Sequence, residues 1–288
     1  MDDQLNFFSE NGYIVVPNAL TADEVAAVND GIDADRAAHP QHWDPGTRPG
    51  HIAVGCDAPE LLHRTEALDP LAHHCSVVPL VRRLLGPGAQ MSGLTFLHRE
   101  PCSAEPPADM HVGDPLCLER VWHREDSGNI EGAERNEFFV PALQVIFYLD
   151  DVDADSHCFS IIPESAETKR KLPKTRTGGN GWGAKDKLRI DDAETGYVDP
   201  DRPRWVDAYG RDLPRRMGGV DVHAKAGSAV MMNNSSYHCG TIRHTQRQRR
   251  TVHVRYRQPE PVSSRHALKP PWESVAQFTM ALPSRLKK

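Results

Sequence analysis

The sequence lacks features that define several classes of protein. Its six cysteines form no Cys-x-x-Cys pair, so it has neither a zinc-knuckle spacing nor the pattern of a disulfide-stapled secreted scaffold. We expect reduced cysteines that serve mainly in packing. Long apolar runs are also missing. The stretch 140–149 is interrupted by Pro141 and Gln144 and is far shorter than the roughly 20 residues of a membrane-spanning helix.

The charge pattern disfavours two kinds of partner. Lys and Arg number 34 against 40 Asp and Glu, which gives a formal net charge of -6, and the basic residues form no long block. Binding to nucleic acid or to an anionic membrane depends on concentrated positive charge and is therefore not expected. Residues 1–12 are acidic and contain no continuous apolar segment, unlike a secretory signal, so we expect a cytoplasmic protein.

The composition and the first third of the chain indicate a globular domain that begins with helices. With 39% hydrophobic and 26% charged residues among 288, the chain can bury a sizeable core, and we expect a single domain over residues 1–288. The pattern predicts a short helix that Gly12 ends, a strand at 13–16, and a helix that begins with a capping box of Thr21 and Glu24. It further predicts a loop over 37–59 and a helical region over 61–85.

After Gly88 the pattern changes to short strands. β-Branched and aromatic residues alternate with turn signals over 92–97, 143–149, 159–162, 228–232 and 251–257. Helices followed by short strands predict an α+β chain, mainly β, whose second part is an antiparallel sandwich or barrel. Residues 164–221 are rich in glycine and charge, which is typical of a substrate lid or of a solvated insertion without a catalytic part.

Three residues have the spacing of a metal site. His123 and Glu125 stand two positions apart, so on an extended strand both side chains point to the same side, and His238 follows the predicted strand 228–232. Two imidazoles and one carboxylate on one face of a metal form the arrangement of non-haem Fe(II) oxygenases. A His-x-Glu pair taken alone also occurs as a surface ion pair.

Two arginines open the last predicted strand. A guanidinium suits bidentate capture of a carboxylate, and a rigid strand would hold it in place. Strand alternation puts Arg249 on a polar face with Thr251 and His253, whereas Arg250 shares its face with apolar residues such as Val252. Arg249 is therefore the better candidate for a pocket.

Several stretches in order resemble one family. They are 8–18 (FSENGYIVVPN), 122–125 (WHRE), 149–153 (LDDVD), 159–165 (FSIIPES), 227–232 (GSAVMM), 237–238 (YH) and the RRTV run at 249–252. Over most of its length the sequence resembles the phytanoyl-CoA dioxygenase-like branch of the Fe(II)/2-oxoglutarate-dependent dioxygenases. The resemblance implies a double-stranded β-helix core, a cupin-like jelly roll, flanked by the N-terminal helices.

The resemblance also implies roles for individual residues. His123, Glu125 and His238 would be the catalytic iron ligands. Arg249, eleven positions after His238 as in the family pattern, would bind the 2-oxoglutarate carboxylate. We also expect Gln144 to touch the cosubstrate region, with a polar residue on an exposed strand face as the alternative.

The sequence departs from the family pattern at two places, and two of the residue assignments have an alternative. Position 125 is Glu where the family has Asp, and Asp126 beside it is the second candidate for the carboxylate ligand. Arg250 is likewise the alternative to Arg249. The stretch Pro163 to Ala166 replaces the family's Pro-Gly-Ser-His turn, which concerns the shape of that loop and not the metal site.

The resemblance implies an enzyme that uses Fe(II), 2-oxoglutarate and O2. It would hydroxylate an unactivated C–H bond of a small molecule of the secondary-metabolite type, with release of succinate and CO2. The first alternative is a cupin-type metalloenzyme that does not use 2-oxoglutarate and is indifferent to Arg249→Ala. The second is a non-catalytic small-molecule binder on the same scaffold.

Overall fold

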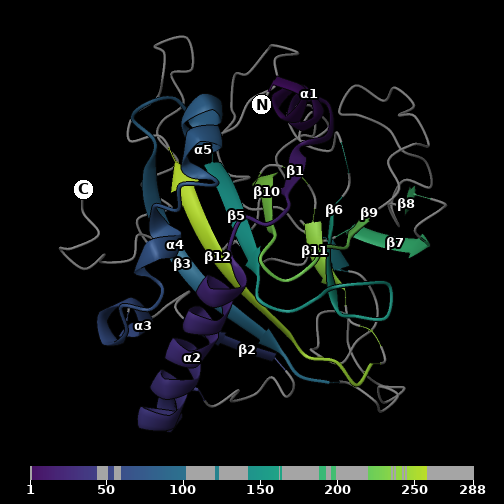
Figure 1. Cartoon of the computed structure of the whole chain (residues 1–288). Helices are drawn as coiled ribbons and strands as arrows, with labels where there is room; N and C mark the ends of the chain where they lie inside the picture. The colour runs from purple at the N-terminus through teal and green to yellow at the C-terminus, as the bar shows by residue number, and fades with distance from the viewer. Residues whose placement is uncertain are drawn as a thin grey trace, which may run out of the picture.

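The computed structural model describes residues 2–43, 51–54, 60–101, 121–122, 142–161, 163, 188–192, 196–198, 220–234, 236, 238–241, 243 and 245–257. Within these residues the chain forms short helices and three antiparallel sheets (Figure 1). The predicted α+β class with an antiparallel β part is therefore confirmed. None of the described helices is long and apolar enough to cross a membrane.

The helices occupy the N-terminal part of the chain. They are α1 (Asp2–Asn11), α2 (Ala22–Ala38), the 3-10 helix η1 (Pro40–His42), α3 (Glu60–Arg64), α4 (Asp69–Ala72) and α5 (Val78–Leu85). Gly12 follows α1 with a φ of 76°, a conformation that favours glycine. The predicted capping box is present, because Thr21 Oγ1 accepts from the Glu24 backbone N–H and Glu24 Oε2 accepts from that of Thr21.

The helical region predicted at 61–85 is present but not continuous, and the expected loop at 37–59 was partly wrong. The region 61–85 is divided among α3, α4 and α5, and the last two carry Pro70 and Pro79 in their first turns. Proline can begin a helix but cannot continue one, so each proline starts a new element. The expected loop at 37–59 contains η1 and the strand β2 (His51–Val54), which pairs with β3.

The largest sheet has six strands. Their order is β1 (Tyr13–Val16), β10 (Ala229–Asn233), β5 (Ala142–Tyr148), β12 (Arg249–Arg257), β3 (Gln90–Arg99) and β2. A second sheet has the order β11 (His238–Thr241), β6 (Cys158–Ile161) and β9 (Val220–Val222). The third sheet contains β4 (Val121–Trp122), β7 (Leu188–Asp192) and β8 (Gly196–Val198), and β4 also contacts β11.

The large sheet is covered on both faces. On one face, alternate residues such as Val145, Phe147 and Val252 form a core with apolar residues of α2, α3, α4 and α5, which lie along the sheet in Figure 1. On the other face, Ile146 and Tyr148 join a second core with residues of β6 and β9. Every residue of β5 is buried as a result.

The face between the two sheets is the one that carries polar side chains. Thr251 pairs with Tyr148 and His253 pairs with Ile146, so these residues share a side of the sheet. The same alternation puts Arg249 on that side, as the sequence predicted. The helices thus cover the outside of the large sheet, and the polar face looks toward the second sheet.

Candidate functional site

His238 is the first residue of β11 and is buried, with 4% of its surface exposed. Its register partner is Ile161 on β6, and its ring packs on Phe159 with 5.8 Å between ring centroids. Its Nδ1 lies 2.9 Å from the carbonyl oxygen of Ser236. A carbonyl oxygen can only accept, so Nδ1 carries the proton and Nε2 carries the lone pair, the tautomer of a histidine that binds a metal through Nε2.

Arg249 opens β12 and has only 5% of its surface exposed. Its Nε has no hydrogen-bond partner among the described residues. Burial lowers the pKa of this guanidinium, since the charged form loses hydration, although Tyr148 counteracts the effect. Arginine stays protonated nonetheless, and a buried charge is costly without an anion.

Arg249 and His238 meet at the same place in the fold. A Cβ added to Gly240 would lie 3.8 Å from Nη2 of Arg249. Gly240 is two residues after His238 on β11, and side chains two apart on a strand share a face. The guanidinium of Arg249 therefore lies beside the strand that begins with His238.

Arg250 lies on the opposite face of β12. Its guanidinium donates to both carboxylate oxygens of Asp33 on α2, at 3.1 and 2.8 Å, and to Asn29. It therefore holds a helix against the sheet. Its backbone N–H donates to Asp150 at 2.7 Å, which fixes the start of β12 next to Arg249.

The two aspartates of the Leu-Asp-Asp stretch, Asp150 and Asp151, accept hydrogen bonds from neighbouring segments. Burial raises the pKa of Asp150, and the hydrogen bond from the Arg250 backbone counteracts that rise. Asp151 accepts from the backbone N–H of Ala226 at 2.9 Å and from Lys225 at 2.8 Å. Both carboxylates thus join the end of β5 to the segments that lead into β10 and β12.

Gln144 is buried on the polar face of β5, so the alternative of an exposed strand face does not apply. Its Nε2 lies 2.7 Å from Nδ1 of His253, and Nε2 of that histidine lies 3.0 Å from Thr251 Oγ1. Gln144 pairs with Arg255, whereas Thr251 near the start of β12 pairs with Tyr148. Gln144 therefore reaches the neighbourhood of Arg249 through His253 and Thr251, and not directly.

His123, Glu125 and the alternative ligand Asp126 lie outside the described residues, as does most of the expected lid at 164–221. The strand β4 ends at Trp122, directly before His123, and it contacts β11, which begins with His238.

His157 is a buried residue that the sequence analysis missed. Its Nε2 lies 2.9 Å from the carbonyl oxygen of Glu100, and its Nδ1 accepts from the backbone N–H of Arg243 at 3.0 Å. Burial lowers its pKa to about 4, so it is neutral near pH 7. The sequence shows only that His157 directly precedes the short strand β6. That position does not predict its contacts with Glu100 and Arg243, which are distant in the sequence.

The site combines a histidine with a correctly placed lone pair, a buried guanidinium and a polar strip between two sheets. Such an arrangement can bind a metal ion at His238 and the carboxylate of a small molecule at Arg249.

The chain resembles known proteins in its sequence profile and in its fold. A sequence profile of the family described as Phytanoyl-CoA dioxygenase (PhyH) matches residues 8–251. No curated protein sequence matches the chain significantly.

Several solved structures resemble the fold. The non-heme alpha ketoglutarate dependent carbocyclase SnoK from nogalamycin biosynthesis has a TM-score of 0.57 at 18% identity, over 90% of this chain and 84% of that chain. The epimerase SnoN in complex with Fe3+, alpha ketoglutarate and nogalamycin RO has a TM-score of 0.56 at 20% identity, over 89% and 83%. HygX from Streptomyces hygroscopicus with iron bound has a TM-score of 0.54 at 14% identity, over 90% and 87%. At these identities the likeness shows the fold alone.

Proposed function

The chain belongs to the phytanoyl-CoA dioxygenase (PhyH) family of Fe(II)/2-oxoglutarate-dependent dioxygenases, and on this premise we propose that it hydroxylates a C–H bond of a small secondary-metabolite-type molecule. In this proposal His123, Glu125 and His238 bind Fe(II), and Arg249 binds the distal carboxylate of 2-oxoglutarate. Gln144 acts on the cosubstrate region through His253. Succinate and CO2 are the coproducts.

The observation that carries the proposal is the buried guanidinium of Arg249 beside β11. Its Nε has no partner among the described residues, and its Nη2 lies next to Gly240, which shares a face of β11 with His238. A carboxylate would satisfy both the charge and the hydrogen-bond donors. By contrast, Arg250 is already paired with Asp33, which favours Arg249 over Arg250.

The strand arrangement supports the proposed ligand set. Contact between β4 and β11 brings the residue before His123 close to the strand of His238. In the large sheet β3 pairs with β12, β12 with β5, and β5 with β10, while β11 pairs with β6 and β6 with β9 in the second sheet. In both sheets, strands that are far apart in the sequence pair with one another. This pairing is consistent with the proposed jelly roll, which would hold the metal at its open end.

The chain's own residues fit iron and 2-oxoglutarate. Ser236 holds the tautomer of His238, Phe159 supports its ring, and Asp150 fixes the start of the strand that carries Arg249. Bound Fe(II) would supply the oxidative chemistry with O2, while these residues orient the reactants and the buried face excludes water.

The structural neighbours support the substrate class. A solved structure of SnoN holds nogalamycin RO and one of HygX holds hygromycin B, both natural products. Because SnoK is a carbocyclase and SnoN an epimerase, ring closure and epimerisation are the alternatives to hydroxylation on the same site.

The test is anaerobic addition of Fe(II) and 2-oxoglutarate to the metal-free protein, followed by the visible charge-transfer band of the chelate. We expect the band in the wild type, its loss in His238→Ala, and cosubstrate binding at least about tenfold weaker in Arg249→Ala, because a charge-assisted bidentate contact is removed. Iron binding without a band, together with an unaffected Arg249→Ala, would favour the cupin-type alternative. Failure to bind iron would favour a non-catalytic binder.

The reaction type is tested separately with O2 and a panel of natural products. Succinate release coupled to a product heavier by one oxygen atom supports hydroxylation. A coupled product without that gain in mass would support cyclisation or epimerisation.

A further inference from the structure

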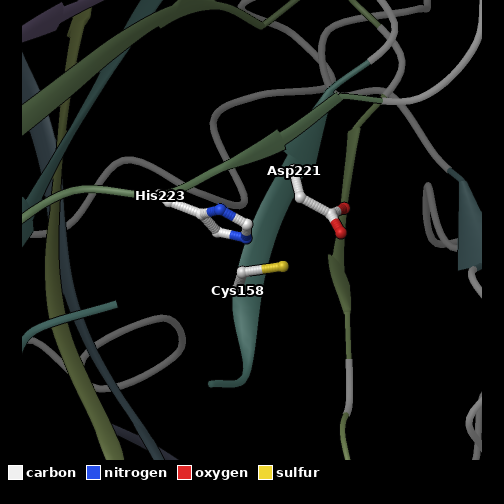
Figure 2. A group of neighbouring side chains, drawn as sticks. All are labelled: Cys158, Asp221 and His223. Atoms are coloured by element: carbon white, nitrogen blue, oxygen red, sulfur yellow. The ribbon is translucent and has the colours of Figure 1, made fainter. Parts of the chain in front are cut away.

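We propose that Cys158, Asp221 and His223 form a second metal site that takes Zn2+. Their ligand atoms all lie within 4.8 Å of one another, and Figure 2 shows the three side chains gathered beside β6 and β9. The proposal does not depend on the oxygenase activity, since it rests on other residues.

The pairing of two strands places the three side chains together. Phe159 pairs with Val222 and Ser160 with Asp221, so Cys158 stands opposite His223. Asp221 lies in β9 and His223 directly follows its last residue, and the two side chains project to the same side in Figure 2. The chelate is therefore built into the backbone register of β6 and β9.

The ligand chemistry selects zinc. Thiolate, imidazole and carboxylate are the ligands that Zn2+ takes in proteins, at about 2.0–2.3 Å. Tetrahedral binding at these lengths requires ligand atoms about 3.3–3.8 Å apart, so no pair of ligand atoms has to close by more than about 1.5 Å. The sulfur ligand disfavours Mg2+ and Ca2+, which prefer oxygen, and Zn2+ binds more tightly than Fe2+ to such donors.

This site cannot share its ion with His238. His238 pairs with Ile161, and Gly240 pairs with Phe159, so His238 lies on the Phe159 face of the second sheet. Cys158 is next to Phe159 in β6 and points to the opposite face.

Neighbouring groups already orient the carboxylate. Ser160 Oγ donates to Asp221 Oδ1 at 2.5 Å, and the guanidinium of Arg243 pairs with Oδ2. Each carboxylate oxygen has a further lone pair for a cation, although the charge of Arg243 weakens cation binding. Cys158 is buried, Asp221 is half-buried and His223 is exposed, so the cation would enter from the side of His223.

The experiment titrates the metal-free, full-length protein with Co2+, a spectroscopic substitute for Zn2+. A thiolate ligand gives an intense sulfur-to-cobalt charge-transfer band in the near ultraviolet, which nitrogen and oxygen ligands do not. We expect this band in the wild type and in His238→Ala, and its disappearance when Zn2+ displaces Co2+. Absence of the band from the folded wild type would overturn the proposal.

Matched variants locate the site. Cys158→Ser should lose the band, whereas Cys239→Ser, at another buried cysteine, should keep it. A band that persists in Cys158→Ser places the thiolate elsewhere. His223→Ala changes an exposed side chain and keeps the test decisive if Cys158→Ser does not fold; we expect Co2+ binding to weaken by more than about tenfold, and unchanged binding would contradict the site.

Arg243→Gln tests the carboxylate ligand. It removes the positive charge beside Asp221 but keeps a hydrogen-bond donor, so we expect Co2+ to bind more tightly. Unchanged or weaker binding would contradict a ligand role for Asp221.

Discussion

At the scale of single residues, Arg249 and Arg250 are adjacent in the sequence but have opposite environments. Arg249 lies between the two sheets, where its Nε has no partner among the described residues. Arg250 lies on the helix side and binds Asp33. One step along a strand reverses the side-chain direction, so this difference follows from the alternation that the sequence already showed.

The two arginines should therefore give separable effects on mutation. Arg250→Ala removes a partly exposed ion pair between β12 and α2, and we expect it to lower the free energy of unfolding by about 1 kcal/mol. Its affinity for 2-oxoglutarate should stay near that of the wild type, unlike that of Arg249→Ala. Urea denaturation and cosubstrate titration of both variants measure this. A larger loss of 2-oxoglutarate affinity in Arg250→Ala would reverse the assignment.

The environment of Gln144 follows only in part from the sequence. Alternation along β5 puts Gln144 on the same face as Ile146 and Tyr148, and its contact with His253, which pairs with Ile146, is on that face. Its contact with His253 depends on the pairing of β5 with β12, which strand alternation within β5 does not specify. The proposed roles of Gln144, His123 and Glu125 stay predictions.

At the scale of elements, a buried ion pair joins the end of α2 to α3. Asp35 accepts from Arg64 Nε at 2.8 Å and Nη2 at 2.9 Å, and from Trp43 Nε1 at 2.8 Å. Burial tends to raise the pKa of Asp35, but the hydrogen bonds from Arg64 and Trp43 outweigh it and hold the pKa below its ordinary value. The carboxylate thus links α2 to Trp43, at the end of η1, and to Arg64 of α3.

Removal of this carboxylate should be costly. Asp35→Ala leaves the charge of Arg64 and the indole N–H of Trp43 without their acceptor, and we expect a loss of about 3–5 kcal/mol in the free energy of unfolding. Asp30→Ala, at an exposed position of the same helix, is the control and should change it by less than about 0.5 kcal/mol. Equal effects in chemical denaturation would show that the ion pair does not stabilise the fold.

The elements differ in how well the sequence predicted them. Strands β3, β5, β6, β10 and β12 and helices α1 and α2 were predicted near their observed bounds. Their apolar periodicity or capping residues act locally. The strand β2 was missed because it is stabilised by pairing with β3, which lies far away in the sequence. A contact of this kind cannot be recognised from the residues of a four-residue segment alone.

At the scale of the whole molecule, two buried histidines make stability depend on pH. Burial lowers the pKa of His98 and of His157 from 6.5 to about 4. The unfolded chain takes up these protons below pH 6.5, whereas the folded protein does so only near pH 4. Their contribution is therefore complete above pH 6.5 and is lost as the pH falls from 6.5 toward 4.

The variant His157→Gln tests this linkage. Glutamine can donate to the Glu100 carbonyl as Nε2 of His157 does, but it does not titrate. We expect the dependence of unfolding free energy on pH between 4 and 6.5 to become shallower by about one proton, or about 1.4 kcal/mol per pH unit. Denaturation at several pH values measures the slope, and a slope equal to that of the wild type would contradict a neutral, buried His157.

The sequence by itself determined the α+β class, the family, the face of Arg249 and the residues proposed to bind iron. These depend on local periodicity and on motif order, which can be read along the chain. Only the tertiary structure decided that Arg249 lies next to Gly240 on the strand of His238, that Arg250 binds a helix, and that Cys158 lies close to Asp221 and His223. These contacts depend on which strands pair and in which register. Burial of apolar residues over the whole chain sets the pairing and the register, and no single segment does so.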